Sequence, residues 1–114
     1  MKTFHVLATP LLVTDYDELA ADCRAWARQP ACVAIEFANT HIVTMCRHDA
    51  AFRDLLSAYD HLLPDGMPLV WCLNRAGAGL RDRVYGSAFM RRFLETVPAG
   101  FTHYLLGGSG ECGA

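Results

Sequence analysis

The residue types that could do chemistry concentrate between positions 60 and 86, which read DHLLPDGMPLVWCLNRAGAGLRDRVYG. Asp65 follows a proline and precedes a glycine, so it lies at a tight turn. Arg81 and Arg83 follow a second turn that contains two glycines. An ionised carboxylate can act as a general base, and an arginine guanidinium binds the paired oxygens of a phosphate. We therefore expect the functional site in this stretch.

A buried strand and a helix are expected to position Asp65. Residues 60–63 predict the strand, and apolar residues between positions 67 and 76 recur at helical spacing. Pro68 falls in the first turn of that helix, where its missing N–H costs no hydrogen bond. The dipole of the helix favours the ionised form of Asp65 at this corner. Two interpretations remain open: Asp65 is a general base, or it is an N-cap that accepts backbone hydrogen bonds.

The rest of the chain alternates between strand and helix patterns. We expect strands at 3–8, 32–37 and 103–106, a further short strand or hairpin at 10–13, and helices near 15–28, 40–46, 49–58 and 87–96. This alternation predicts an α/β fold with a Rossmann-like parallel sheet layered with helices. Ligands of such sheets bind beyond the carboxyl ends of the strands, where Asn39 and Thr40 would lie.

Composition narrows the class of protein. The 114 residues suffice for at most one domain, and 53% of them are hydrophobic, so the chain can form a core, in which we place Trp26 and Trp71. The net charge of −2, with no run of one sign, argues against a nucleic-acid partner. The five cysteines form no CxxC pair, and the histidines form no HxxxH or HxH, so we expect reduced thiols, a cytoplasmic location and no metal site.

Two motifs, in order, resemble one family. Residues 64–71, PDGMPLVW, are similar to the PDGxPLVW signature of the WecG/TagA/CpsF glycosyltransferases, and residues 83–86 are similar to their RVYG signature. Residues 104–108 resemble the strand and glycine turn that follow. The resemblance covers nearly the whole chain but only the front portion of the family's domain. It implies that residues 1–114 are a single partial glycosyltransferase domain, apparently truncated at the C-terminus.

The resemblance also implies an activity. It is the inverting transfer of a sugar similar to N-acetylmannosamine from a UDP-sugar to a polyprenyl-diphosphate-linked acceptor, during synthesis of bacterial cell-surface polysaccharide. Asp65 would be the base, and Arg83 would neutralise the leaving diphosphate. No cofactor is implied beyond the donor itself. We further expect peripheral contact with the inner face of the membrane and possible assembly into a homo-oligomer.

Substrate-binding residues follow from the same resemblance. Asn39 is similar to the Asn of the family's T-x-N motif, but Phe37 stands where that motif has Thr, which puts the donor sugar or the acceptor in doubt. Simpler roles remain open for several positions: a helix cap for Asn39, packing on the core for Tyr85, and pairing with Asp82 for the two arginines. The full implied set is Asn39, Thr40, Gly66, Arg81, Tyr85, Gly107 and Gly108.

The end of the chain supports other hypotheses. The predicted strand at 103–106 should be followed by a covering helix, yet few residues remain, so we expect a fragment, a truncation or a misread frame. The chain would then be an inactive remnant or a nucleotide-binding module without turnover. Residues 108–113 also fit GxGxxG, a weak indication of an NAD-type oxidoreductase.

Overall fold

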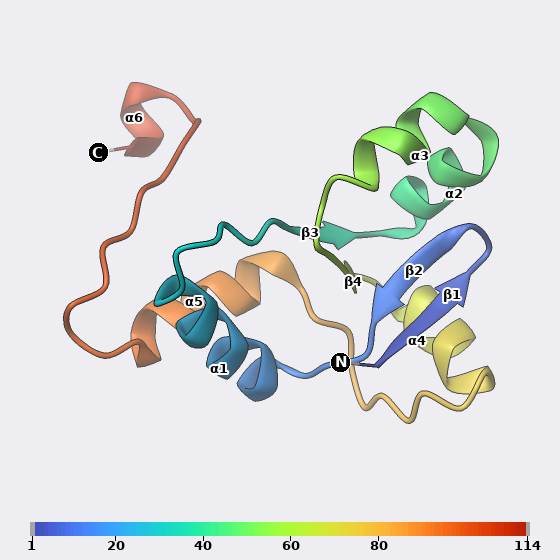
Figure 1. Ribbon diagram of the computed structural model, residues 1–114, viewed down its shortest axis with the longest axis horizontal. Coiled ribbons are helices and arrows are strands. Elements are labelled where there is room, and N and C mark those ends of the chain that lie inside the picture. The colour runs from blue at the N-terminus through green and yellow to red at the C-terminus, as the bar shows by residue number, and fades with distance from the viewer. Residues whose placement is uncertain (1, 114) are drawn as a thin grey trace.

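The computed structural model describes residues 2–113 and has a mixed α/β fold (Figure 1). The chain opens with a hairpin in which β1 (Thr3–Val6) pairs antiparallel with β2 (Thr9–Leu12). Leu7 lies in the connecting turn with a φ of 54°. The hairpin interpretation of residues 10–13 is therefore confirmed, and the first strand is shorter than predicted.

The second sheet contains the parallel pair. β3 (Ile35–Ala38) pairs with β4 (His61–Pro64), and their register places Ile35 opposite His61 and Ala38 opposite Pro64. The crossover between them contains α2 (Thr40–His48) and α3 (Ala50–Leu56). Within residues 2–113 the strands form two sheets of two strands each, so a larger Rossmann-like layered sheet is not confirmed.

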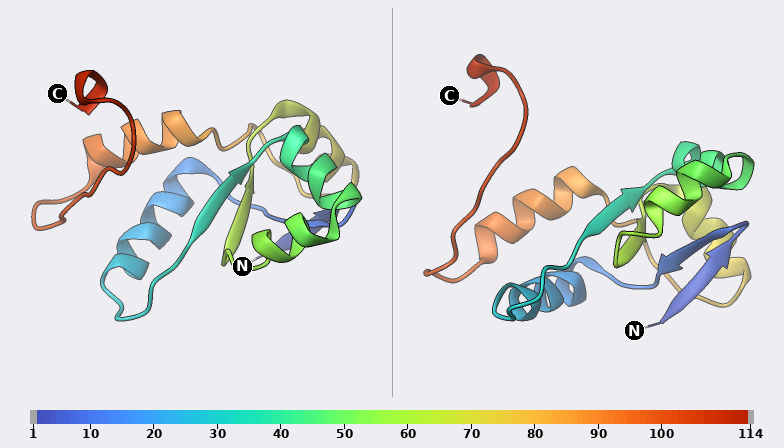
Figure 2. Two further views of the ribbon diagram at one scale, coloured as in Figure 1. Left: turned by 90° about the horizontal axis from the view of Figure 1, so that it is seen from above. Right: turned by 45° about the horizontal axis from the view of Figure 1, so that its top comes forward.

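The remaining helices are α1 (Tyr16–Ala27), α4 (Met67–Arg75), α5 (Gly86–Thr96) and the short α6 (Gly110–Gly113). α1 begins at the N-cap Asp15, whose carboxylate accepts a 2.8 Å hydrogen bond from the N–H of Glu18. α1 and α5 lie beside each other, and α4 lies against the β1–β2 hairpin (Figures 1 and 2). The helices from α1 to α5 agree with the predicted ones to within a few residues.

β4 joins the two halves of the hydrophobic core. Successive side chains of a strand point to opposite faces. Leu62 accordingly packs in a cluster under the hairpin and α4, while Leu63 packs in a cluster under α1 and α5. The first cluster contains Leu11, Ala38, Val43, Leu62, Leu69 and Leu73, and the second contains Leu12, Leu19, Ala20, Leu63, Val84 and Phe89.

Two predictions about apolar residues are wrong. Residues 103–106 are not a strand: they lie in an extended segment after α5 that reaches away from both sheets (Figures 1 and 2). A strand needs a neighbour for its backbone hydrogen bonds, and no strand of the described residues lies beside this segment. Trp71 is 63% exposed on the outer face of α4, whereas Trp26 is half-buried.

Candidate active site at the carboxyl end of the parallel strands

Two backbone hydrogen bonds bring the candidate residues together at the carboxyl end of β4. The N–H of Asp65 donates to the carbonyl of Ala38 at 2.9 Å, which extends the pairing of β3 with β4. The N–H of Val84 donates to the carbonyl of Pro64 at 3.1 Å, on the returning RVYG segment. Asp65 is therefore the donor of the first hydrogen bond, Asn39 follows its acceptor Ala38, and Arg83 precedes Val84, the donor of the second.

The carboxylate of Asp65 is available for chemistry. Gly66 is the N-cap residue of α4, and no side chain among the described residues caps this helix. The interpretation of Asp65 as an N-cap is therefore wrong. Asp65 is half-buried, and its carboxylate makes no hydrogen bond or ion pair within residues 2–113. It follows β4 directly and precedes the amino end of α4, whose dipole favours negative charge.

The guanidinium of Arg83 lies over the ring of Tyr85, with 4.6 Å between its Cζ and the ring centroid. A cation over an aromatic face is attracted by the ring quadrupole, so this contact orients Arg83. Tyr85 is 41% exposed, and packing on the core is the wrong interpretation for it. Asp82 accepts a hydrogen bond from the backbone N–H of Arg83 at 2.8 Å. Within the described chain its carboxylate forms no ion pair with Arg81 or with the guanidinium of Arg83.

Tyr16 and Arg92 belong to the same arrangement, although nothing in the sequence indicated them. The hydroxyl of Tyr16 accepts a hydrogen bond from the N–H of Tyr85 at 3.1 Å. The Cζ of Arg92 lies 5.5 Å from the centroid of the Tyr16 ring, and its Nη2 is 3.4 Å from a carboxylate oxygen of Asp17. Tyr16 and Tyr85 are 69 positions apart, so only the fold reveals their contact.

A cavity of about 670 Å³ opens beside these residues, within the size range of small-molecule sites. Three arginines from two segments line it: Arg81, Arg83 and Arg92. Arginine forks bind phosphate oxygens in pairs, so the cavity suits an anionic ligand. Three acidic residues also line the cavity and reduce its net positive charge: Asp15, Glu18 and Asp82.

Asn39 serves as the N-cap of α2, because its Oδ1 accepts a 2.9 Å hydrogen bond from the N–H of Ile42. The helix-cap interpretation is therefore confirmed, and a role in substrate binding is left to the Nδ2 group. Thr40 is exposed in the first turn of α2, and its carbonyl accepts a hydrogen bond from Thr44 Oγ1 at 2.8 Å. Both residues lie at the carboxyl end of β3, as the sequence predicts.

Phe37 packs against α5. Its ring centroid lies 5.8 Å from that of Phe89, and a Cβ added at Gly86 would come within 3.3 Å of its Cγ. The bulky residue that replaces the threonine of the family pattern thus contacts the glycine of the RVYG motif.

The structure does not bring Gly107 and Gly108 to this site. They lie in the extended segment after α5, with φ values of 109° and 78° (Figure 1). Nor does a strand precede residues 108–113, so the GxGxxG pattern lacks the context that a dinucleotide site requires.

No three His, Cys, Asp or Glu side chains among the described residues gather closely enough to hold a metal ion. None of the helices in this part of the chain has the length and apolar character needed to cross a membrane.

Asp65 does not line the arginine cavity; the connection between them is Val84, which lines the cavity and donates to the carbonyl of Pro64. A carboxylate after a parallel strand and an arginine cavity on the segment bonded to that strand describe an α/β protein with a site suited to an anionic substrate. The family model described as the Glycosyl transferase WecG/TagA/CpsF family matches residues 4–113, so the chain belongs to this family. The family comprises glycosyltransferases of cell-surface polysaccharide synthesis. A search of curated proteins found no match.

Proposed function

We propose that the protein transfers a sugar similar to N-acetylmannosamine from a UDP-sugar to a polyprenyl-diphosphate-linked acceptor, with inversion at the anomeric carbon. Membership of the family supports transfer of a sugar. The assignment of Asp65 as the base rests on one observation. The residue is half-buried at the carboxyl end of β4, and its carboxylate forms no ion pair in the described chain.

In the proposed reaction, Asp65 takes the proton of the acceptor hydroxyl as that oxygen attacks the anomeric carbon. The bond between this carbon and the diphosphate oxygen breaks, and its electron pair leaves with UDP. Attack from the face opposite the leaving group inverts the configuration. The donor is the only cofactor-like molecule that the mechanism needs.

The departing diphosphate gains negative charge that must be neutralised. Arg83 is the first candidate, because its guanidinium lies on the Tyr85 ring and lines the arginine cavity. Arg81 and Arg92 line the same cavity and would add charge-assisted hydrogen bonds to the phosphate oxygens. Asn39 and Thr40 would contact the sugar or the acceptor, and Gly66 lets the chain turn closely beside them.

The alternative function is nucleotide binding without turnover. The same arginine cavity supports it, because binding a diphosphate requires no base. Protection against thermal unfolding separates ligand classes: UDP should raise the melting temperature in either case, and NAD should not. Only the transferase also forms product.

The decisive test is the variant Asp65→Asn, which keeps the shape of the side chain and removes its basicity. Transfer from a labelled UDP-sugar to a polyprenyl-diphosphate-linked acceptor should fall by about 10²-fold or more, since general-base catalysis is worth that much. Asp22→Asn on α1 is the matched control and should retain activity. Near wild-type turnover of Asp65→Asn would refute the assignment, and UDP protection without any turnover of the wild type would favour the binding module.

A further inference from the structure

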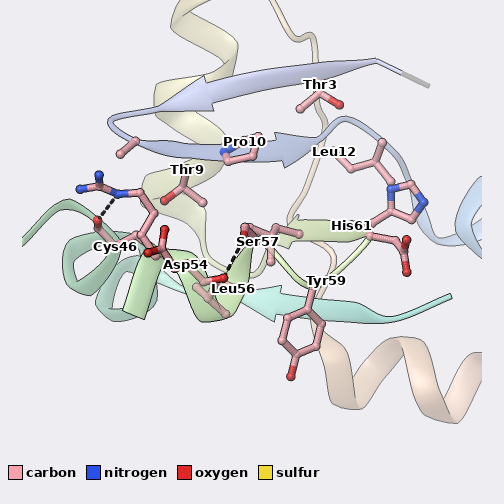
Figure 3. A pocket seen from close by; sticks show the side chains of 14 residues that line it. Thr3, Thr9, Pro10, Leu12, Cys46, Asp54, Leu56, Ser57, Tyr59 and His61 are labelled. Carbon is pink, nitrogen blue, oxygen red and sulfur yellow. Dashed lines mark hydrogen bonds between the residues drawn. The ribbon is translucent and has the colours of Figure 1, made fainter. Parts of the chain in front are cut away.

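A second cavity, of about 460 Å³, lies between the β1–β2 hairpin and α3 (Figure 3). Its lining includes His61, the first residue of β4, whereas Asp65 follows the last residue of the same strand. Because a strand rises about 3.3 Å per residue, the two positions are on the order of 13 Å apart along β4. The cavity is therefore separate from the candidate active site, and nothing in the transfer reaction uses it.

Thr9 is the unexplained residue of this cavity. It is 1% exposed, and its Oγ1 has no hydrogen-bond partner within residues 2–113. Its side chain extends from β2 toward α3 (Figure 3). Buried polar groups of native proteins are nearly always hydrogen-bonded, so a hydroxyl in this position indicates a partner from outside the described chain.

The other polar groups around the cavity offer mainly acceptors. Asp60 accepts one hydrogen bond through Oδ2, from the N–H of Ala34 at 2.8 Å. Its Oδ1 accepts no hydrogen bond within residues 2–113. The carboxylate of Asp54 makes no hydrogen bond or ion pair in the described part of the chain, although its backbone carbonyl accepts one from Ser57. A complementary ligand must therefore donate several hydrogen bonds.

Arg53, the arginine that lines the cavity, already donates its hydrogen bonds elsewhere. Nε and Nη2 of Arg53 donate to the carbonyls of Cys46 and Arg47 at 2.8 and 3.1 Å. These contacts hold Arg53 against the end of α2, so it does not form an ion pair with Asp54. An anionic ligand would meet two carboxylates here, which makes a phosphate or a nucleotide a poor fit.

Apolar surface completes the lining. Pro10, Leu12, Leu56 and Leu62 line it, and Tyr59 adds a ring that is 39% exposed. His61 is held in place by stacking on Trp26, with 4.8 Å between the ring centroids. A small ring with an apolar face and several hydroxyl donors matches this mixture of surfaces.

We propose that this cavity is a binding site for a neutral or amino monosaccharide, whose hydroxyl or amino groups donate to Thr9, Asp54 and Asp60. No covalent step takes place there. The proposal does not rest on the transferase activity, because it uses a different cavity and different residues. A trapped water molecule at Thr9 is the competing explanation for the unpaired hydroxyl.

Titration of the ¹⁵N-labelled protein with methyl α-glucoside, methyl α-mannoside and glucosamine tests the site. We expect saturable shifts of the amide signals of residues 9, 54 and 57–61, with a dissociation constant on the order of 1–10 mM. Lack of saturation by every probe up to about 100 mM would overturn the proposal.

Two variants make the test specific. Thr9→Val keeps the shape of the side chain and removes the hydroxyl, and Asp54→Asn changes an exposed position that the fold does not need. Each should weaken saccharide binding about tenfold, because Thr9→Val removes one hydrogen bond and Asp54→Asn replaces a charge-assisted hydrogen bond by a weaker neutral one. Thr102→Val and Asp22→Asn, outside the cavity, should bind as the wild type does.

The outcomes separate this proposal from the transferase proposal. Unchanged binding by both Thr9→Val and Asp54→Asn would overturn the saccharide site and favour the trapped water. Shifts confined to the region of Asp65 and Arg83 would also overturn it, and would locate sugar binding in the candidate active site instead. Loss of transfer in Asp65→Asn, with saccharide shifts intact at Thr9, would support both proposals independently.

Discussion

Two four-residue segments of this chain look alike in sequence and differ completely in structure. The first, HLLP at 61–64, is β4, and the second, HYLL at 103–106, lies in the extended segment after α5. Leu63 is fully buried, whereas Leu106 is 90% exposed. The difference comes from neighbours: β3 pairs with β4 along its length, and no strand of the described chain pairs with the second segment.

The contrast explains where the candidate site forms. The hydrogen bonds at the end of β4 fix Asp65 relative to Asn39 and Arg83. Gly107 and Gly108 follow the second segment, and no backbone hydrogen bond within residues 2–113 anchors them, so they lie away from the site. An apolar pattern alone therefore does not place a residue, because burial requires a partner surface.

The largest effect is expected from removing apolar volume from the buried segment. Leu63→Ala would leave a cavity between α1, β4 and α5, where Leu63 is fully buried. We expect a loss of about 3 kcal/mol in the free energy of unfolding, which chemical denaturation measures. A loss below about 1 kcal/mol would mean that the cluster collapses around the gap, contrary to the close packing expected of a core.

Much of the fold could be predicted because helix signals are local. Asp15, Asn39 and Asp49 all cap helices through the hydrogen bonds that their residue types favour. The parallel pairing of β3 with β4 also follows from the two helices between them. The strand prediction for residues 103–106 is wrong because a strand pattern carries no information about whether a partner strand is present.

The candidate site could be predicted only in part. Asp65 and Arg83 were found through motifs, and the fold brings their segments together. Tyr16 and Arg92 were missed because their contacts join α1 to the segments around Tyr85 and α5. The packing of Phe37 against Gly86 likewise depends on a tertiary contact.

The thiol of Cys23 reports how well the cluster around Leu63 excludes water. Burial, and then the nearby carboxylate of Asp22, raise its pKa from 9.0 to about 11. The folded state therefore holds this proton more tightly than the unfolded state does. The resulting stability is full below pH 9.0 and is lost as the pH rises through about 11, by on the order of 2 kcal/mol, since one pKa unit is about 1.4 kcal/mol.

Unfolding of the wild type and of Cys23→Ala between pH 8 and 11.5 measures this effect. We expect the stability difference between the two proteins to shrink as the pH rises. Alkylation at pH 8 gives a second readout, because the exposed Cys32 and Cys72 should react faster than Cys23. A constant stability difference and equal alkylation rates would mean that the cluster admits water.

A smaller effect is expected where the RVYG motif meets β3. Gly86→Ala would place a Cβ 3.3 Å from Cγ of Phe37, so the ring must move by a few tenths of an ångström. We expect a loss of about 1 kcal/mol, at the low end of the cost of overpacking. Gly110→Ala is the control, because a Cβ there meets nothing within 4 Å. Recovery of stability in the double variant Phe37→Leu, Gly86→Ala would attribute the loss to this contact.

The smallest effect is expected in the exposed segment that resembles β4. Leu105 is 70% exposed, so Leu105→Ser removes little buried surface and should change the free energy of unfolding by no more than about 0.5 kcal/mol. Chemical denaturation, run beside Leu63→Ala, measures the contrast between the two segments directly. A loss above about 1 kcal/mol would show that Leu105 is buried in solution, which requires a surface beyond those that residues 2–113 provide within one chain, such as a second copy. Dependence of that loss on protein concentration would then identify the second copy as the partner, because association stabilises the folded state by mass action.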